Sequence, residues 1–115
     1  MNLYWCSTSD HDEDWFIIAP RNRDARRIHA YEEGYNFEDT KAQFVCRIPQ
    51  CSLSYERGWP SHELLVVCGA EIVRESQPRI VEIAGSTYEE GRLDAEIDRH
   101  QWIARFIEQG VYNAS

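Results

Sequence analysis

The stretch WFIIAPRNRDARRIHAYEEG, residues 15–34, carries a strand signal followed directly by a helix signal. Trp15 to Ala19 is an uninterrupted apolar run of strand length, and Pro20 ends it because proline has no N–H for a ladder hydrogen bond. Asn22 can cap the helix that follows, and Gly34 can end that helix in a left-handed conformation. A buried strand that leads straight into a helix predicts a layered domain of mixed structure.

Similar signals continue on both sides of this stretch. The sequence predicts further strands at 3–8, 43–48, 71–74 and 79–83. It predicts a short helix capped by Ser61 and a last helix whose apolar face is formed by Leu93, Ile97, Ala104 and Ile107. Ser86 and Thr87, each followed three residues later by glutamate, fit a capping box before that helix. We therefore expect one α+β domain, a mainly antiparallel sheet with about three helices, in the order strand, strand, helix, strand, helix, strand, strand, helix.

Composition and charge argue against some classes of function. The chain has 115 residues, an apolar fraction of 43% and a net charge of −8, which opposes direct binding to nucleic acid. The longest apolar run, residues 64–70, is far below the roughly 20 residues that cross a bilayer. Because no secretory signal is visible, we expect a cytoplasmic location, in a bacterium or its host cell, and four reduced cysteines. No motif indicates a cofactor.

Several segments resemble a group of small bacterial and phage proteins. They are LYWCSTSDHDEDWFIIA, ARRIHAYEEGY, FVCRIP, LLVVCGAEIVRE and PRIVEIAGSTYEEG. The resemblance implies an origin in a phage or another mobile element. It implies no activity and no site, because the segments are those that form the fold.

The acidic stretch before Trp15 is the first candidate site. Asp10, Asp12 and Asp14 alternate, so their carboxylates would point to one side of an extended chain, as a hard cation requires. A calcium loop beginning at Asp10 would need glycine and glutamate where Trp15 and Arg21 stand. We therefore predict no metal here and interpret the stretch as an exposed turn between two strands.

Thiols and histidines give a weaker indication of chemistry. Cys46 and Cys51 have nearly the spacing of a zinc pair, but no second pair follows. Cys51 could act as a nucleophile with His29, His62 or His100 as its base, although nothing in the sequence brings them together. We predict no catalytic residues, and a small enzyme remains the alternative.

Arg23, Arg26 and Arg27 form a basic segment in an acidic chain. Their spacing places them on one stripe of the predicted helix, near an N-terminus whose dipole opposes positive charge. Ion pairs with Glu32, Glu33 or the acidic turn would account for this stripe. The alternative is a site for an anion, a phosphate-bearing ligand or an acidic partner.

The leading hypothesis is a module that binds another protein, such as a host defence or nucleic-acid-handling protein with a basic groove, and inhibits it by occupying its surface. Asp10, Asp12, Glu13 and Asp14 would attract that groove. Tyr55, Arg57 and Trp59, in the long loop over 50–60, would supply the close contacts. Further hypotheses are a nucleotide or phosphate binder that uses the arginine stripe, and a homo-oligomer that pairs basic with acidic segments.

Overall fold

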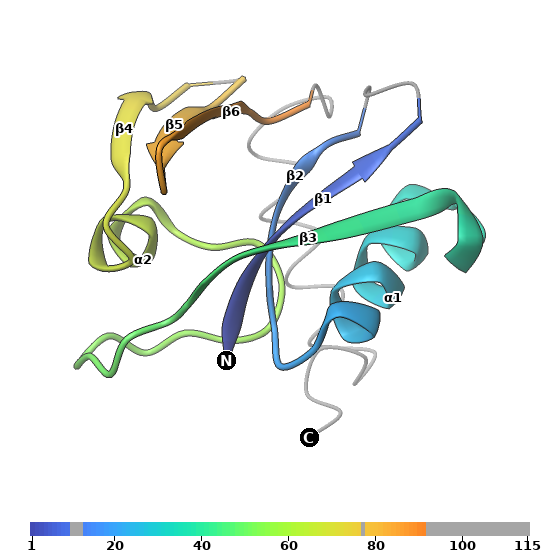
Figure 1. Cartoon of the computed structure of the whole chain (residues 1–115), viewed down its shortest axis with the longest axis horizontal. Helices are drawn as coiled ribbons and strands as arrows, with labels where there is room; N and C mark the ends of the chain where they lie inside the picture. The colour runs from blue at the N-terminus through green and yellow to red at the C-terminus, as the bar shows by residue number, and fades with distance from the viewer. Residues whose placement is uncertain (10–12, 77, 92–115) are drawn as a thin grey trace.

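The computed structural model describes residues 1–9, 13–76 and 78–91 (Figure 1). Its strands form two antiparallel sheets, with the orders β2-β1-β3 and β4-β5-β6. The strands are β1 (Asn2–Thr8), β2 (Trp15–Ala19), β3 (Thr40–Arg47), β4 (Glu71–Arg74), β5 (Ile80–Ile83) and β6 (Ser86–Glu89). The helices are α1 (Asn22–Glu33), the 3₁₀ helix η1 (Phe37–Asp39) and α2 (His62–Val67). The predicted α+β class is confirmed, with the strands divided between two sheets.

The first sheet, β2-β1-β3, is the middle layer of the molecule. One face packs against α1, where Trp15 and Ile17 of β2 meet Ile28. The other face packs against α2 and the second sheet, where Phe16 of β2 meets Leu65. Every residue of β2 is therefore buried, because alternate side chains of the strand enter two different cores.

The start of α1 differs from the prediction. Arg21 occupies the N-cap position without a side-chain cap hydrogen bond, and Asn22 is the first helical residue. The Asn22 side chain instead donates to the carbonyl of Ala42 on β3, 2.6 Å away. The predicted capping role of Asn22 is therefore wrong, whereas the helix does end at Gly34, which has a φ of 75°.

The segment predicted as a capping box is a strand. Ala84 and Gly85 both have positive φ angles, 52° and 78°, and Ile83 pairs directly with Ser86 across this two-residue turn. Turns of this kind match the twist of a hairpin, so β6 returns alongside β5. The capping-box prediction is wrong. Two-residue hairpin turns usually begin with asparagine, aspartate or glycine, and the alanine at position 84 gives no such indication of a turn.

The last predicted helix, around Leu93 to Ile107, lies outside the described residues. Within the described ranges, no helix combines the length and the apolar character needed to cross a membrane.

Strand β3 is an edge strand whose pairing is limited in three ways. Among the described residues it pairs with β1 alone. Side chains of α1 occupy two of its carbonyls, since Asn22 donates to Ala42 and Arg26 donates to Thr40. The register shifts at Val45, because Tyr4 pairs with Phe44 while Leu3 pairs with Cys46. Capped carbonyls and a bulge both disfavour the addition of another strand, so this edge gives no support to a homo-oligomer formed by strand pairing.

Candidate functional site

The acidic turn is only partly described, and its last residue has a structural role. Asp10 and Asp12 lie outside the described residues. Asp14 is buried, and its Oδ1 accepts a hydrogen bond of 3.1 Å from the backbone N–H of Thr8. The carbonyl of Asp14 accepts a second hydrogen bond from the N–H of Gly91. Asp14 therefore holds the connection between β1 and β2 from inside and is not positioned to meet a partner.

Glu13 and Glu33 form a carboxyl pair beside the same turn. Trp15 Nε1 donates to Glu33 Oε2 over 2.6 Å, and His29 Nε2 lies 2.5 Å from the carbonyl oxygen of Glu13. Burial raises the pKa of Glu33 to about 8, the Trp15 hydrogen bond lowers it, and the nearby carboxyl of Glu13 raises it again. Such a pair holds a proton near neutral pH, which is the property of a general acid or a pH-sensitive contact.

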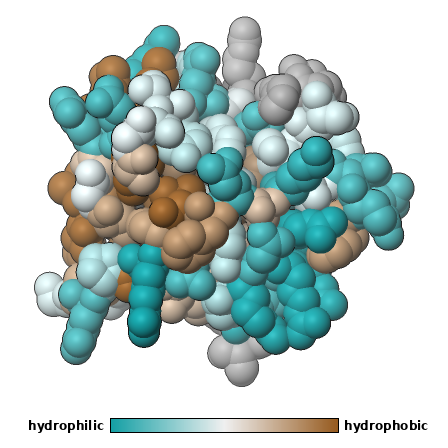
Figure 2. Space-filling model, in the orientation of Figure 1, coloured by the Kyte–Doolittle hydropathy of each residue, from teal (hydrophilic) through white to brown (hydrophobic). Residues whose placement is uncertain are grey.

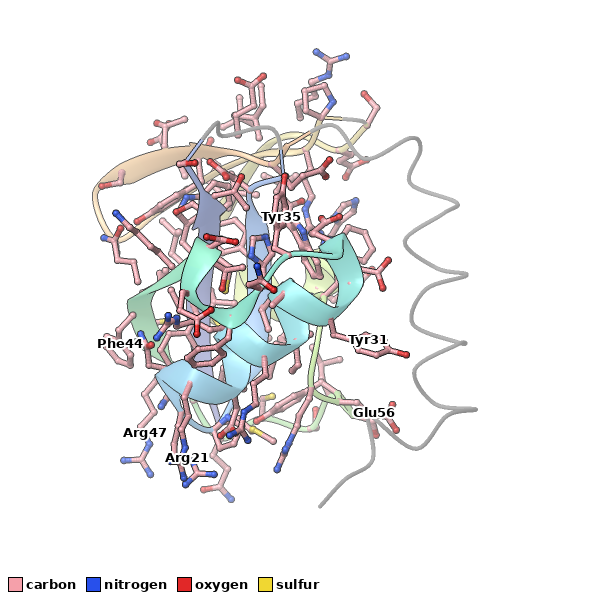
Figure 3. The ribbon with its side chains drawn as sticks, turned by 90° about the vertical axis from the view of Figure 1, so that its right-hand side faces the viewer. Arg21, Tyr31, Tyr35, Phe44, Arg47 and Glu56 are labelled. Carbon is pink, nitrogen blue, oxygen red and sulfur yellow. The ribbon has the colours of Figure 1, made fainter. Side chains whose placement is uncertain are left out.

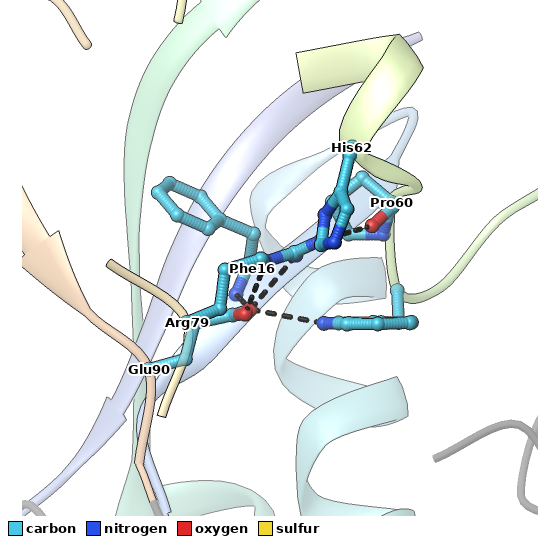
Figure 4. A network of polar contacts seen from close by, with 6 residues as sticks. Phe16, Pro60, His62, Arg79 and Glu90 are labelled. Carbon is cyan, nitrogen blue, oxygen red and sulfur yellow. Dashed lines mark hydrogen bonds and ion pairs between the residues drawn. The ribbon is translucent and has the colours of Figure 1, made fainter. Parts of the chain in front are cut away.

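Trp59 is buried and belongs to a polar network, so it is not an exposed anchor. Figure 4 shows Arg79, Glu90 and His62 of this network. Its Nε1 donates to Glu90 Oε2 over 3.0 Å, and the guanidinium of Arg79 lies 4.3 Å from its ring centroid. Arg79 and Glu90 form an ion pair of 2.6 Å, and both are almost fully buried. Arg79 also donates to Nδ1 of His62 and to the carbonyl of Pro60. Because its polar groups are engaged within the core, this network is structural.

The arginine stripe divides into two parts. Arg26 donates to the carbonyls of Thr40 and Phe37, each over 3.0 Å, and its guanidinium lies 4.0 Å above the ring of Phe37. Arg23 and Arg27 are exposed. Arg26 therefore fastens α1 to the beginning of β3, and the stripe does not offer three cations to one ligand.

Among the described residues, those predicted to bind a partner do not form one surface. The acidic turn follows Thr8 at one end of β1, whereas Tyr55 and Met1 line a pocket at the other end. These ends are separated by the length of a seven-residue strand, roughly 20 Å at about 3.3 Å per residue. Figure 1 shows the Thr8 end of β1 and the loop between β3 and α2 on opposite sides of the molecule.

An open pocket lies where β3 ends and the long loop begins. Its volume is about 440 Å³, and it is lined by residues that include Met1, Arg47, Cys51 and Tyr55. Figure 3 shows the side chains of Arg21 and Arg47 at this same end of the molecule. Arg57 is half-buried and precedes Gly58, whose backbone pairs with Ile18 at the edge of β2. Cys51 and Tyr55, which the sequence indicated for different reasons, therefore share one pocket.

Three half-buried thiols pack against the core near this pocket, and we call them the thiol cluster: Cys46, Cys51 and Cys68. All three pack against the same core and are free thiols. Cys68 contacts the thiol of Cys46 and also interacts with Cys51. Burial raises the pKa of Cys46, and burial together with both neighbouring thiols raises the pKa of Cys68 to about 12.

Apolar side chains of this region reach the surface. Figure 2 shows them gathered over α2 and the adjoining part of β3. We define the apolar patch as Val45, Cys46, Val66 and Cys68; Val66 is 55% exposed, and the other three are half-buried. Large apolar areas with a polar rim are typical of protein interaction sites.

Three exposed carboxylates belong to α2, β4 and β5, and we call them the acidic rim: Glu63, Glu71 and Glu82. Glu63 lies one helical turn before Val66 on α2, and Glu71 begins β4. Glu71 pairs directly with Glu82 of β5, and all three glutamates are exposed. Like charges directly opposite each other destabilise a sheet, so the fold gains nothing from this pair.

The described histidines make no catalytic arrangement with a thiol. His29 contacts Glu13 and Trp15, and His62 accepts a hydrogen bond from Arg79. Across residues 1–9, 13–76 and 78–91, no group of three or more histidines, cysteines or acidic residues has the geometry of a metal site.

Comparison of the chain with protein-family models, with curated proteins and with solved structures gives no match.

Two features of this region escaped the sequence analysis. The thiol cluster gathers residues from β3, the long loop and the C-cap of α2 around one core, and their spacing along the chain does not indicate this. In the acidic rim, Glu71 of β4 lies directly opposite Glu82 of β5. The sequence does not determine the register of these two strands, so this pairing could not be predicted. The available signal was Glu82 between the apolar residues Val81 and Ile83, because exposed positions of a strand alternate with buried ones.

Proposed function

We propose that this chain is a protein-binding module that contacts a basic surface of its partner with the apolar patch and its acidic rim. The observation that carries the proposal is the exposed Val66 beside Glu63 and near the opposed pair of Glu71 and Glu82. An apolar centre with a charged rim provides desolvated contact area and electrostatic orientation together.

The partner that best fits this surface carries a basic groove. The net charge of −8 attracts such a groove over a distance and repels nucleic acid. A compact acidic domain that occupies the groove would exclude the nucleic acid that normally lies there. We therefore propose inhibition of a host defence or nucleic-acid-handling protein in the bacterial or host-cell cytoplasm, with a mobile-element origin of the gene implied by the resemblance noted above.

Two of the alternative hypotheses, the phosphate binder and the small enzyme, have less support. A phosphate binder based on the arginine stripe would lack Arg26, which is engaged with Thr40 and Phe37. Nucleophilic catalysis would require a base beside a thiol, and the contacts of the two described candidates, His29 and His62, do not supply one, while His100 lies outside the described residues. We accordingly propose a function that is not enzymatic.

The proposal is tested by capture from a nuclease-treated bacterial lysate with the wild-type chain and two matched variants. The first variant, V66S/E71Q, alters the patch and its rim. The control, F44S/E38Q, removes an equally exposed apolar side chain on the α1 side of the first sheet and one carboxylate of η1.

We expect a partner that the wild type and the control retain and that V66S/E71Q loses. Nucleic acid added to the purified complex should displace the chain. Equal retention by both variants, or capture that nucleic acid does not affect, would contradict the proposed surface or the proposed groove, respectively.

A further inference from the structure

The open pocket at the end of β3 has two walls of different origin. One wall is the end of the first sheet, where Met1 and Arg47 lie, and the other is the loop over residues 49–57, to which Tyr55 belongs. The volume of about 440 Å³ is within the range of pockets that hold small molecules, roughly 300–1,000 Å³. A ligand of matching size would contact both walls at once.

The loop over residues 49–57 is fixed at its two ends and not between them. Before it, the N–H of Ile48 donates to the carbonyl of Met1 over 3.0 Å. After it, Gly58 exchanges two hydrogen bonds with Ile18, of 2.7 and 2.9 Å. In the part of the chain that the structure describes, no hydrogen bond or ion pair involves a residue of 49–57. The N–H groups of this loop are therefore available to a ligand, and apolar packing alone opposes its movement.

The lining of the pocket is positively charged. Its one charged side chain is the exposed guanidinium of Arg47, and it contains no carboxylate, although the whole chain has 20 acidic and 12 basic residues. Figure 3 shows the side chain of Glu56 well apart from those of Arg21 and Arg47. Charges more than about 8 Å away are largely screened at physiological salt, so the acidic remainder of the chain does not exclude an anion from this pocket.

Tyr55 places an aromatic ring in the same pocket. It is half-buried and packs against the core, so its position is defined by contacts behind it. Aromatic side chains pack favourably against planar rings, and the guanidinium of an arginine binds two oxygens of a carboxylate or phosphate at once. The lining therefore matches a molecule that combines a planar ring with a negative charge.

We propose that this pocket binds a small aromatic anion, with a carboxylate or phosphate as its charged group, and that the loop over residues 49–57 closes over it. Arg47 binds the anionic oxygens, and the ring of Tyr55 packs against the ring of the ligand. N–H groups of the loop donate to the oxygens that Arg47 leaves without a partner. The site shares no residue with the arginine stripe, the apolar patch or the acidic rim, so it does not depend on the proposed function.

Four small probes test the ligand chemistry on the full chain. Phenyl phosphate and benzoate are the two aromatic anions, benzyl alcohol is the neutral aromatic control, and inorganic phosphate is the anion without a ring. Each is titrated into the isotope-labelled chain and followed by NMR of the backbone amides. We expect signal shifts concentrated in residues 47–57, and tighter binding of an aromatic anion than of either control by about threefold or more, the effect of an exposed ion pair. The tighter of the two aromatic anions identifies the charged group.

Matched variants assign the roles of the side chains. R47Q should weaken the binding of both aromatic anions by about threefold or more and leave benzyl alcohol unaffected. Y55L keeps the apolar volume but removes the ring, so it should weaken the aromatic probes and leave inorganic phosphate unaffected. R27Q removes an exposed arginine outside the pocket and should bind as the wild type does. V66S/E71Q should also bind as the wild type does, which separates this site from the proposed contact surface.

Closure of the loop is measured by amide hydrogen exchange. With saturating phenyl phosphate, the amides of residues 50–57 should exchange more slowly by about threefold or more, whereas those of the turn at Ala84 and Gly85 should be unchanged. Unchanged exchange in the loop would overturn the proposal. Equal weakening by R47Q and R27Q, equal binding of benzyl alcohol and the aromatic anions, or signal shifts that spare residues 47–57 would also overturn it.

Discussion

Arg79 and Glu90 form an ion pair of 2.6 Å between side chains that are 2% and 1% exposed. Glu90 also accepts hydrogen bonds from Trp59 Nε1 and from the backbone N–H of Phe16. Phe16 belongs to the first sheet and Arg79 directly precedes β5, so the pair joins the two sheets through the core. A buried charge whose partner is removed is left without compensation, which makes this contact a sensitive point of the fold.

Replacement of Glu90 by glutamine should therefore be severely destabilising. We expect a loss of about 3–5 kcal/mol in the free energy of unfolding, because Arg79 remains buried without its counter-ion. The measurement is urea unfolding followed by tryptophan fluorescence. E89Q, at the exposed neighbouring position on β6, is the control and should change the free energy by less than about 0.5 kcal/mol. Similar losses in the two variants would contradict the structural role of the network.

The carboxyl of Glu33 should make stability fall as pH rises. Its pKa is raised from 4.5 to about 8 in the folded chain, so the folded state keeps a proton that the unfolded state releases. The stabilisation is complete below pH 4.5 and is lost as the pH rises toward 8. E33Q, which mimics the protonated carboxyl, should melt above the wild type at pH 8, and the difference should shrink toward pH 5. A difference in melting temperature that stays constant between these pH values would refute this role of Glu33.

Because only Arg26 of the arginine stripe fastens α1 to β3, we expect alanine substitutions along the stripe to affect the free energy of unfolding unequally. R26A should lower the free energy of unfolding by about 1–3 kcal/mol, since it removes two hydrogen bonds and a cation–π contact. R23A and R27A, at exposed positions, should each change it by less than about 0.5 kcal/mol. Thermal and urea unfolding of the three variants measure this order, and a larger loss in R23A or R27A would contradict it.

The N-terminus of α2 is stabilised by a local contact, the side-chain cap of Ser61. Ser61 Oγ accepts a hydrogen bond of 3.1 Å from the N–H of Leu64. S61A should cost about 0.5–2 kcal/mol, whereas S61D should preserve most of the stability because aspartate also caps helices. Equal losses in both variants, measured by urea unfolding, would mean that the cap hydrogen bond contributes little.

Much of the fold could be predicted from the sequence, because the decisive signals are local. The apolar run of β2, the proline after it, the glycine that ends α1 and the serine that caps α2 each act within a few residues. The β5–β6 hairpin was missed because its turn contains Ala84, which adopts a positive φ that alanine rarely takes.

The candidate site could be predicted only in part, because it depends on contacts between distant segments. Trp59 has the composition of an interface anchor, but Glu90, 31 residues later, draws it into the core. Asp14 likewise has the sequence context of an exposed turn, but it is buried and hydrogen-bonded to Thr8 and Gly91. Tyr55 lies near the Met1 end of β1 and Asp14 near the Thr8 end, a separation that no local pattern expresses.

Hydrogen–deuterium exchange of the chain, free and bound to its captured partner, tests the proposed contact surface most directly. We expect slower exchange in residues 61–73, which contain α2 and most of β4, and in the part of β3 around Val45. Exchange in η1 and the adjoining end of α1, residues 31–39, should be unchanged. Protection confined to residues 31–39, with α2 and β4 exchanging as in the free chain, would rule out the proposed contact surface.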